Sequence, residues 1–182
     1  MASTHDYHND PRNDNILIYI NGEYFQRSEA KVSVLDSGYL LGDGVWEGIR
    51  LHKGHLVHLD EHLDRLYSGA ETLAMDIGLS KVEVKQALET TILKNGMKSD
   101  VHIRLIVSRG IKKTPYQSPK VTMGNPTVVV IPEYKKASEE VKKKGITLAT
   151  VTTRRDHTVQ DLSLIHISAP TRRYASSYGV FG

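Results

Sequence analysis

The arrangement of hydrophobic and polar positions along the chain predicts several short strands. Strands are expected over residues 16–20, 45–52 and 101–108, because each is rich in apolar and β-branched residues and is bounded by turn residues. Residues 127–131 read TVVVI, a continuous apolar run of the kind that forms a buried strand. Asn21-Gly22 directly follows the first strand and is typical of a tight hairpin turn.

Two helices are expected in the middle of the chain. The first begins near residue 59, with apolar residues at helical spacing along one face and with Asp60 as its N-cap. The second has a capping box in Ser80 and Glu83 and a stop signal in Asn95-Gly96. A small mixed or antiparallel sheet with two helices, followed by the beginning of a second domain, indicates an α+β fold.

A glycine-rich stretch precedes the second predicted strand. Gly38, Gly42 and Gly44 suit a tight bend where the backbone approaches a ligand or another strand. Arg65 lies at the border of the apolar stripe of the first helix. Its aliphatic stem can therefore lie on apolar surface while its guanidinium binds an oxyanion, and a phosphate group suits this position.

The composition narrows the class of protein. The 182 residues carry a net charge of +3, with 39% hydrophobic and 25% charged residues, as in an ordinary globular protein. No basic stripe is interleaved with aromatic residues, so nucleic-acid binding is not expected. The absence of cysteine excludes a disulfide framework and a thiolate site. The sequence shows neither a signal-peptide core near its start nor an apolar run of membrane-spanning length, so we expect a cytoplasmic protein that binds no membrane.

Four histidines, His52, His55, His58 and His62, invite a different interpretation, a metal-binding module. Imidazole ligands must converge on one point. His55 and His58 should point to opposite faces of a hairpin, and no acidic side chains that would support the ligands are evident. We therefore expect no metal site among them.

Two motifs carry a resemblance to a known family. GYLLGDGVWEGIR, followed by LDEHLDRLYSGA, closely resembles the N-terminal domain of the class IV aminotransferases, which are fold-type IV pyridoxal-phosphate enzymes. That family includes branched-chain and D-amino acid aminotransferases and aminodeoxychorismate lyases. The resemblance extends more loosely from residue 20 to about residue 161 and includes VHIRLIVSRG. It implies pyridoxal 5'-phosphate as cofactor, an amino acid and a 2-oxo acid as substrates, and a homodimeric parent enzyme.

The resemblance also implies roles for individual residues. Arg65, in the HLDRL motif, is the arginine that binds the cofactor phosphate, and Trp46 and Leu41 line the substrate pocket. Arg104 corresponds to a carboxylate-binding arginine of branched-chain enzymes, and Arg109, in the motif SRG, to one of D-amino acid enzymes. Alternate residues of a strand face opposite sides, so the two arginines are not expected to reach the same pocket.

Several alternatives stay open at this point. Leu41 stands where branched-chain enzymes often carry an aromatic residue, whereas DSGYLLGDG favours the D-amino acid group, so substrate and stereochemistry are undecided. The structural alternative for Arg65 is a helix-surface ion pair with Asp64 or Glu61. The structural alternative for Arg104 is an ion pair with a nearby acidic side chain.

The family's Schiff-base lysine and the carboxylate that protonates the cofactor ring lie in the C-terminal domain, beyond the segment matched here. The last lysine of this sequence is Lys144. We therefore assign no catalytic residue and expect a fragment of an aminotransferase that is inactive as given. The alternatives are a fragment of an aminodeoxychorismate lyase-like enzyme and a non-catalytic dimerisation or metal-binding module.

Composition and resemblance together divide the chain into four parts. Residues 1–15 are polar and are expected to form a mobile tail. Residues 16–120 form the N-terminal aminotransferase domain, and residues 121–161 the linker and the beginning of the C-terminal cofactor domain. Residues 162–182 no longer resemble the family, and their opening resembles translated sequencing-adaptor sequence, so an unrelated or artefactual tail is expected.

Overall fold

The computed structural model describes residues 9–136 and 139–145. The chain divides into two compact units, of which one comprises Asn9–Lys136. The sequence predicts a charge-rich connection over residues 135–144 and a strand over residues 146–151. The short helix α4 (Glu139–Lys144) lies in the first of these segments and belongs to the other unit. The second segment and the tail expected over 162–182 lie outside the described residues.

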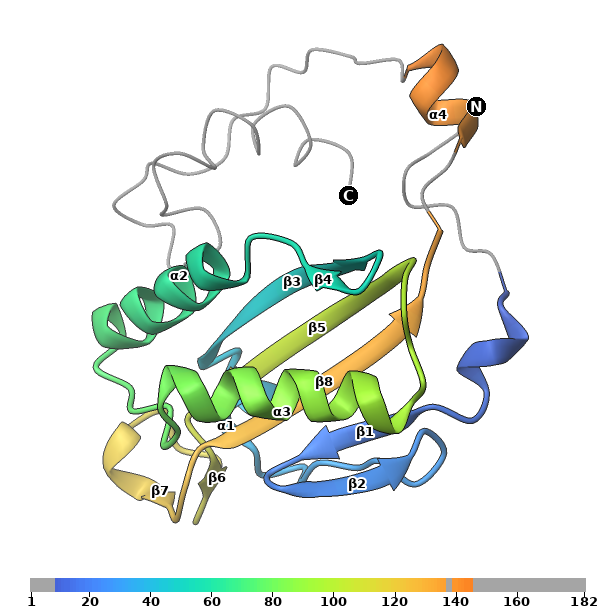
Figure 1. Cartoon of the computed structure of the whole chain (residues 1–182). Coiled ribbons are helices and arrows are strands. Elements are labelled where there is room, and N and C mark those ends of the chain that lie inside the picture. Colours follow the sequence, from blue (N-terminus) through green and yellow to red (C-terminus); the bar gives the residue numbers. More distant parts are fainter. Residues whose placement is uncertain (1–8, 137–138, 146–182) are drawn as a thin grey trace. The chain divides into compact units, whose positions relative to one another are not determined.

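A six-stranded antiparallel sheet forms the centre of the unit Asn9–Lys136 (Figure 1). The strands expected over residues 16–20, 45–52, 101–108 and 127–131 are confirmed, and the last one extends beyond residue 131. This strand lies between the first strand and the strand at residues 101–108, so the unit continues past residue 120. In spatial order the strands are β2 (Glu23–Gln26), β1 (Leu17–Ile20), β8 (Thr127–Tyr134), β5 (Val101–Ser108), β3 (Gly44–His52) and β4 (His55–Leu56).

Helices α2 (Leu59–Thr72) and α3 (Lys81–Lys94) lie across the same face of this sheet (Figure 1). We call this the helix face and the opposite side the far face. The predicted α+β class is confirmed. None of the helices in the described ranges has the length and apolar character needed to cross a membrane. The buried residues that join the two layers are Leu59, Leu63, Leu66, Ala70, Val84, Ala87 and Leu88 from the helices and Ile49, Ile103, Leu105 and Val130 from the sheet.

The start of α3 is as predicted, but the start of α2 is not. Ser80 and Glu83 form the expected capping box. Asp60 is not the N-cap of α2, because the helix begins at Leu59 and follows His58, whose φ of 51° is left-handed. The chain leaves the hairpin only just before this point, so His58 has to make the turn. Asp60 instead lies in the first helical turn, where its charge favours the positive end of the helix dipole.

The glycine-rich stretch forms a short helix as well as a bend. Helix α1 (Ser37–Leu41) begins after Asp36, whose carboxylate accepts a 2.8 Å hydrogen bond from the backbone N–H of Gly38, and it ends at Gly42 in the left-handed region. The expected close approach occurs at Gly44, where a Cβ atom would lie 2.5 Å from the carbonyl oxygen of Val107. Residues 110–125 are rich in Lys, Pro, Gly, Ser and Thr, which predicts a loop. This segment also contains two short paired strands, β6 (Ile111–Lys112) and β7 (Thr122–Met123).

Two asparagine side chains extend the hydrogen bonding of the sheet. Asn95 accepts from the backbone N–H of Leu17 at 2.7 Å and donates to its carbonyl at 3.0 Å, while also donating to the carbonyl of Thr91 at 2.8 Å. Asn13 bonds both backbone groups of Tyr134 in the same way. Asn13 belongs to the part expected as a tail, and this contact attaches it to the end of β8.

Replacing Asn95 tests how much this side-chain pairing stabilises the unit. We expect Asn95→Ala to lower the free energy of unfolding by about 1–3 kcal/mol, because two backbone groups of Leu17 lose their partner. Asn95→Asp keeps the acceptor but sets a carboxylate oxygen against the carbonyls of Leu17 and Thr91 at the C-terminus of α3, so its loss should be at least as large as that of Asn95→Ala. Urea denaturation followed by circular dichroism measures both, and an Asn95→Ala variant as stable as the wild type would contradict the prediction.

Candidate functional site

Arg65 is held by a buried carboxylate of the neighbouring strand. Glu47, on β3, points to the helix face, and its side chain is 4% exposed. It accepts a 2.6 Å hydrogen bond from Arg65 Nε at Oε1 and a second bond from Arg65 Nη2 at Oε2. His62 Nδ1 lies 2.7 Å from the same Oε2 atom. We call these three residues the Glu47 cluster.

The partners considered for Arg65 from sequence, Asp64 and Glu61, form other pairs. Asp64 accepts from Lys81 on α3, and Glu61 lies 3.5 Å from His58. Sequence reasoning missed Glu47. Its signal was present, because a carboxylate at an inward position of an apolar strand requires a cationic partner.

The electrostatics of the Glu47 cluster favour its charged form. Burial raises the pKa of the Glu47 carboxyl, but the hydrogen bonds from His62 and Arg65 outweigh burial and lower that pKa overall. The bond to Glu47 raises the pKa of Arg65. Glu47 and Arg65 are therefore both ionised at neutral pH. Removing either one would leave the other charge poorly compensated in a partly buried place.

Trp46 and Arg104 meet on the far face of the sheet. Trp46 precedes Glu47 on β3 and so points the other way. The guanidinium carbon of Arg104, on β5, lies 4.1 Å from the centroid of the indole ring, in the range of a cation–π contact. Within the described ranges, no carboxylate forms an ion pair with Arg104. Two residues that the sequence assigned to the substrate pocket are thus brought together.

Two further polar residues of this face, His102 and Arg50, were not predicted as site residues. His102 pairs across strands with Arg50 and is on the same side of β5 as Arg104. A Cβ atom at Gly48 would lie 3.0 Å from His102 Nε2, so glycine leaves room for the imidazole. Burial, with smaller effects of Arg50, Lys135 and Arg104, lowers the pKa of His102 to about 4. The ring is neutral at physiological pH.

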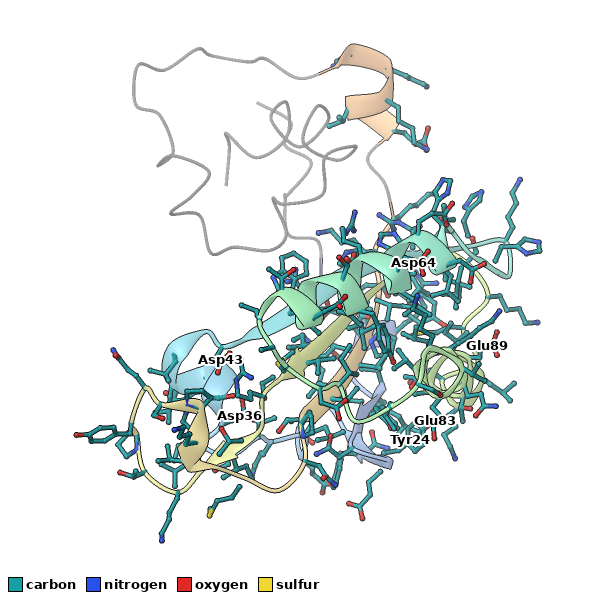
Figure 2. All side chains as sticks on the ribbon, turned by 90° about the vertical axis from the view of Figure 1, so that its left-hand side faces the viewer. Tyr24, Asp36, Asp43, Asp64, Glu83 and Glu89 are labelled. Atoms are coloured by element: carbon teal, nitrogen blue, oxygen red, sulfur yellow. The ribbon has the colours of Figure 1, made fainter. Side chains whose placement is uncertain are left out.

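Arg109 and Leu41 lie at the end of the sheet next to α1. Arg109 donates to both carboxylate oxygens of Asp43, at 2.8 and 3.1 Å, and to the carbonyls of Leu73 and Ala74, each at 2.9 Å. Figure 2 shows Asp43 at this end of the unit, near Asp36. Leu41, the last residue of α1, is 41% exposed. Arg109 lies just beyond the end of β5, and its bonds to Asp43, Leu73 and Ala74 tie it to the end of α2.

The side chains of the four histidines of the hairpin and of α2 do not converge on a common point. His52 and His55 face each other at the exposed end of the hairpin, and His58 lies near Glu61. His62 alone turns to Glu47. Among the residues that the structure describes, no three His, Asp or Glu side chains are arranged to hold a metal ion.

The lowered pKa of His102 predicts a loss of stability in mild acid. The unfolded chain binds a proton near pH 6.5, whereas the folded chain binds it only near pH 4. Unfolding is therefore favoured progressively as the pH falls from 6.5 to 4. We expect His102→Gln to flatten the fall of the unfolding free energy in this window, and the exposed His55→Gln to leave it unchanged. Equal slopes for wild type and His102→Gln would refute the assignment.

The contacts of Arg109 predict a structural loss on replacement. Arg109→Lys should destabilise the fold by about 1–3 kcal/mol, because lysine cannot reproduce the planar set of donors that reaches Asp43 and two carbonyls. The comparison variant is Arg27→Lys, whose partner Glu133 is exposed and lies at 3.3 Å, and which should cost about 0–1 kcal/mol. Thermal unfolding measures the difference, and equal losses would mean that the Arg109 bonds contribute little.

The family model, the similar proteins and the similar solved structures all point to one family. Residues 44–176 match the family described as amino-transferase class IV, a match that runs past residue 161. Over 146 residues the chain is 42% identical to branched-chain-amino-acid aminotransferase-like protein 1 of Arabidopsis thaliana, covering 80% of this chain and 26% of that protein. Over 110 residues it is 37% identical to D-alanine aminotransferase of Bacillus licheniformis, covering 58% and 38%.

A solved structure shows the same fold. It is the branched-chain aminotransferase of the thermophilic archaeon Thermoproteus uzoniensis with norvaline, which matches with a TM-score of 0.66 and 28% identity. The similarity covers 81% of this chain and 49% of that one, so the chain spans less than half the length of each of these three relatives. The extent of the family match and the agreement of the relatives show that this chain belongs to the class IV aminotransferases.

Proposed function

We propose that this chain is part of a pyridoxal-phosphate-dependent enzyme that transfers an amino group between an amino acid and a 2-oxo acid. The amino acid is of the branched-chain or the D-amino acid type, as the names of the similar proteins suggest. We propose that the parent enzyme is a homodimer, as the family resemblance implies, and that it is cytoplasmic, as expected from the sequence composition. Residues 145–182 contain no lysine that would hold the aldehyde of the cofactor, so we propose that these 182 residues do not complete a turnover alone.

The residues present fit the phosphate end of the cofactor. Pyridoxal phosphate, when bound, supplies the electron sink for chemistry at the α-carbon of the amino acid. Arg65 would hold its phosphate, since its side chain is 28% exposed and its guanidinium plane is fixed by Glu47. A planar guanidinium suits the geometry of phosphate oxygens.

The single observation that supports the proposed substrate site is the contact of the Arg104 guanidinium with the ring of Trp46. Its positive charge faces an aromatic ring and no carboxylate within the described ranges, so it keeps the charge that a substrate carboxylate requires. His102 and Arg50 lie beside it and add a neutral imidazole and a second cation. We propose that Arg104 binds the carboxylate and that Trp46 lines the pocket.

We also propose Leu41 and Arg109 as substrate-binding residues. Leu41 has exposed apolar surface for a substrate side chain, but it lies at the end of α1. Arg109 would have to release Asp43 or a carbonyl group before it could bind a substrate carboxylate with the same donors.

The sole tryptophan of the chain gives a direct test of the substrate proposal. Because Trp46 stacks on Arg104, we expect 4-methyl-2-oxopentanoate to change its fluorescence saturably. Arg104→Lys should raise the dissociation constant by about tenfold or more, because lysine loses the bidentate geometry.

Arg27→Lys provides the matched control, because Arg27 pairs with Glu133 and has no role in the proposal. It should bind the 2-oxo acid as the wild type does. Wild-type protein without a saturable signal, or an Arg104→Lys variant with wild-type affinity, would contradict the proposed carboxylate site.

A further inference from the structure

The position of Glu47 is unusual for a residue that only joins two elements. Its carboxylate is 4% exposed on a strand whose neighbouring inward positions, Val45 and Ile49, are apolar. Burying a carboxylate is unfavourable unless its oxygens are paired. Here both oxygens bond to Arg65, and one of them also lies 2.7 Å from His62 Nδ1.

The geometry fixes the plane and the direction of the Arg65 guanidinium. Arg65 presents its Nε and Nη2 edge to the carboxylate, which is the bidentate arrangement that leaves least rotational freedom. His62 lies one helical turn before Arg65 on the same side of α2, so it reaches the same carboxylate.

The position of His62 also selects its tautomer. Nδ1 lies 2.7 Å from a carboxylate oxygen of Glu47, an acceptor, and 3.1 Å from Arg65 Nη2, a donor. The shorter contact is satisfied when Nδ1 carries a hydrogen and donates it to Glu47. His62 then holds the carboxylate from a second direction and keeps it aimed at Arg65.

We propose that Glu47 and His62 are positioning residues for Arg65. They hold the guanidinium in the orientation that receives the phosphate of the cofactor, without touching the phosphate themselves. A long arginine side chain loses rotamer freedom when it binds a ligand. A side chain that is already held in its binding orientation loses less of this freedom. The inference rests on the proposed role of Arg65 in phosphate binding.

A purely structural role would have a different signature. If the Glu47 cluster only joined β3 to α2, its disruption would weaken the fold and would affect the binding of a phosphorylated and a non-phosphorylated ligand equally. If it positions Arg65, the loss falls on the phosphate-dependent part of the affinity alone. The ratio of the two affinities separates the two roles.

The experiment measures this ratio with pyridoxine 5'-phosphate and pyridoxine, which lack the aldehyde that reacts with surface lysines. Equilibrium dialysis with the full chain gives both dissociation constants. We expect the wild type to bind the phosphorylated ligand about tenfold or more tightly, as charge-assisted bonds to phosphate imply. Arg65→Ala should bring the ratio close to one. Glu47→Asp, which keeps the balancing charge but withdraws the carboxylate from Arg65, and His62→Gln should each lower it several-fold while the affinity for pyridoxine stays unchanged.

Glu133→Asp serves as the matched control, because it shortens in the same way the carboxylate of the exposed pair with Arg27. It should keep the wild-type ratio. Circular dichroism verifies folding, and if Glu47→Asp does not fold, His62→Gln decides alone, since it leaves the pair of Glu47 and Arg65 in place.

Two results would overturn the inference, and they are distinguishable. If Arg65→Ala loses the ratio while Glu47→Asp and His62→Gln keep it, the positioning role is wrong and the phosphate role of Arg65 stands. If the wild type itself does not distinguish the two ligands, then Arg65 is not a phosphate anchor, and the proposed cofactor role fails together with the inference.

Discussion

The ion pair between Glu47 and Arg65 is the interaction on which the arrangement of the candidate site depends. It joins β3, which pairs with both β4 and β5, to α2, and it does so through a carboxylate that is 4% exposed. Because side chains alternate along a strand, placing Glu47 under the helix also places Trp46 on the far face. One strand thereby orients the candidate phosphate arginine on one side of the sheet and the candidate substrate pocket on the other.

Local sequence signals predicted most elements of the fold and missed those set by neighbours in space. The limits of α3 could be predicted because Ser80, Glu83 and Asn95 act within a few residues of the helix ends. The start of α2 could not, because the exit from the hairpin fixes it and places His58 in a left-handed conformation. The short helix α1 was missed although its signals are local: Asp36 caps its start and Gly42 ends it, but its glycines suggested only a bend.

The candidate site shows the same division between local and distant information. The pairing of Trp46 with Arg104 follows from two strands whose faces could be predicted by alternation, once the family motif had marked them. The partner of Arg65 could not be found by looking along its own helix, because Glu47 lies 18 residues earlier in the chain. Periodicity can mark a buried carboxylate as needing a cation, but only the packing of α2 on β3 identifies which cation it is.

Arg104 and Arg65 differ in the group that contacts their guanidinium, and this difference determines how each could bind an anion. An aromatic ring attracts a cation without neutralising it, so Arg104 keeps a net charge that draws a carboxylate from solution. Arg65 is already balanced by Glu47, so its attraction for a phosphate depends on directed hydrogen bonds more than on net charge. Hydrogen bonds weaken steeply when misaligned, whereas attraction to a net charge does not. In the proposed roles, orientation therefore matters more for Arg65 than for Arg104, and the contacts of Arg65 with Glu47 would supply that orientation.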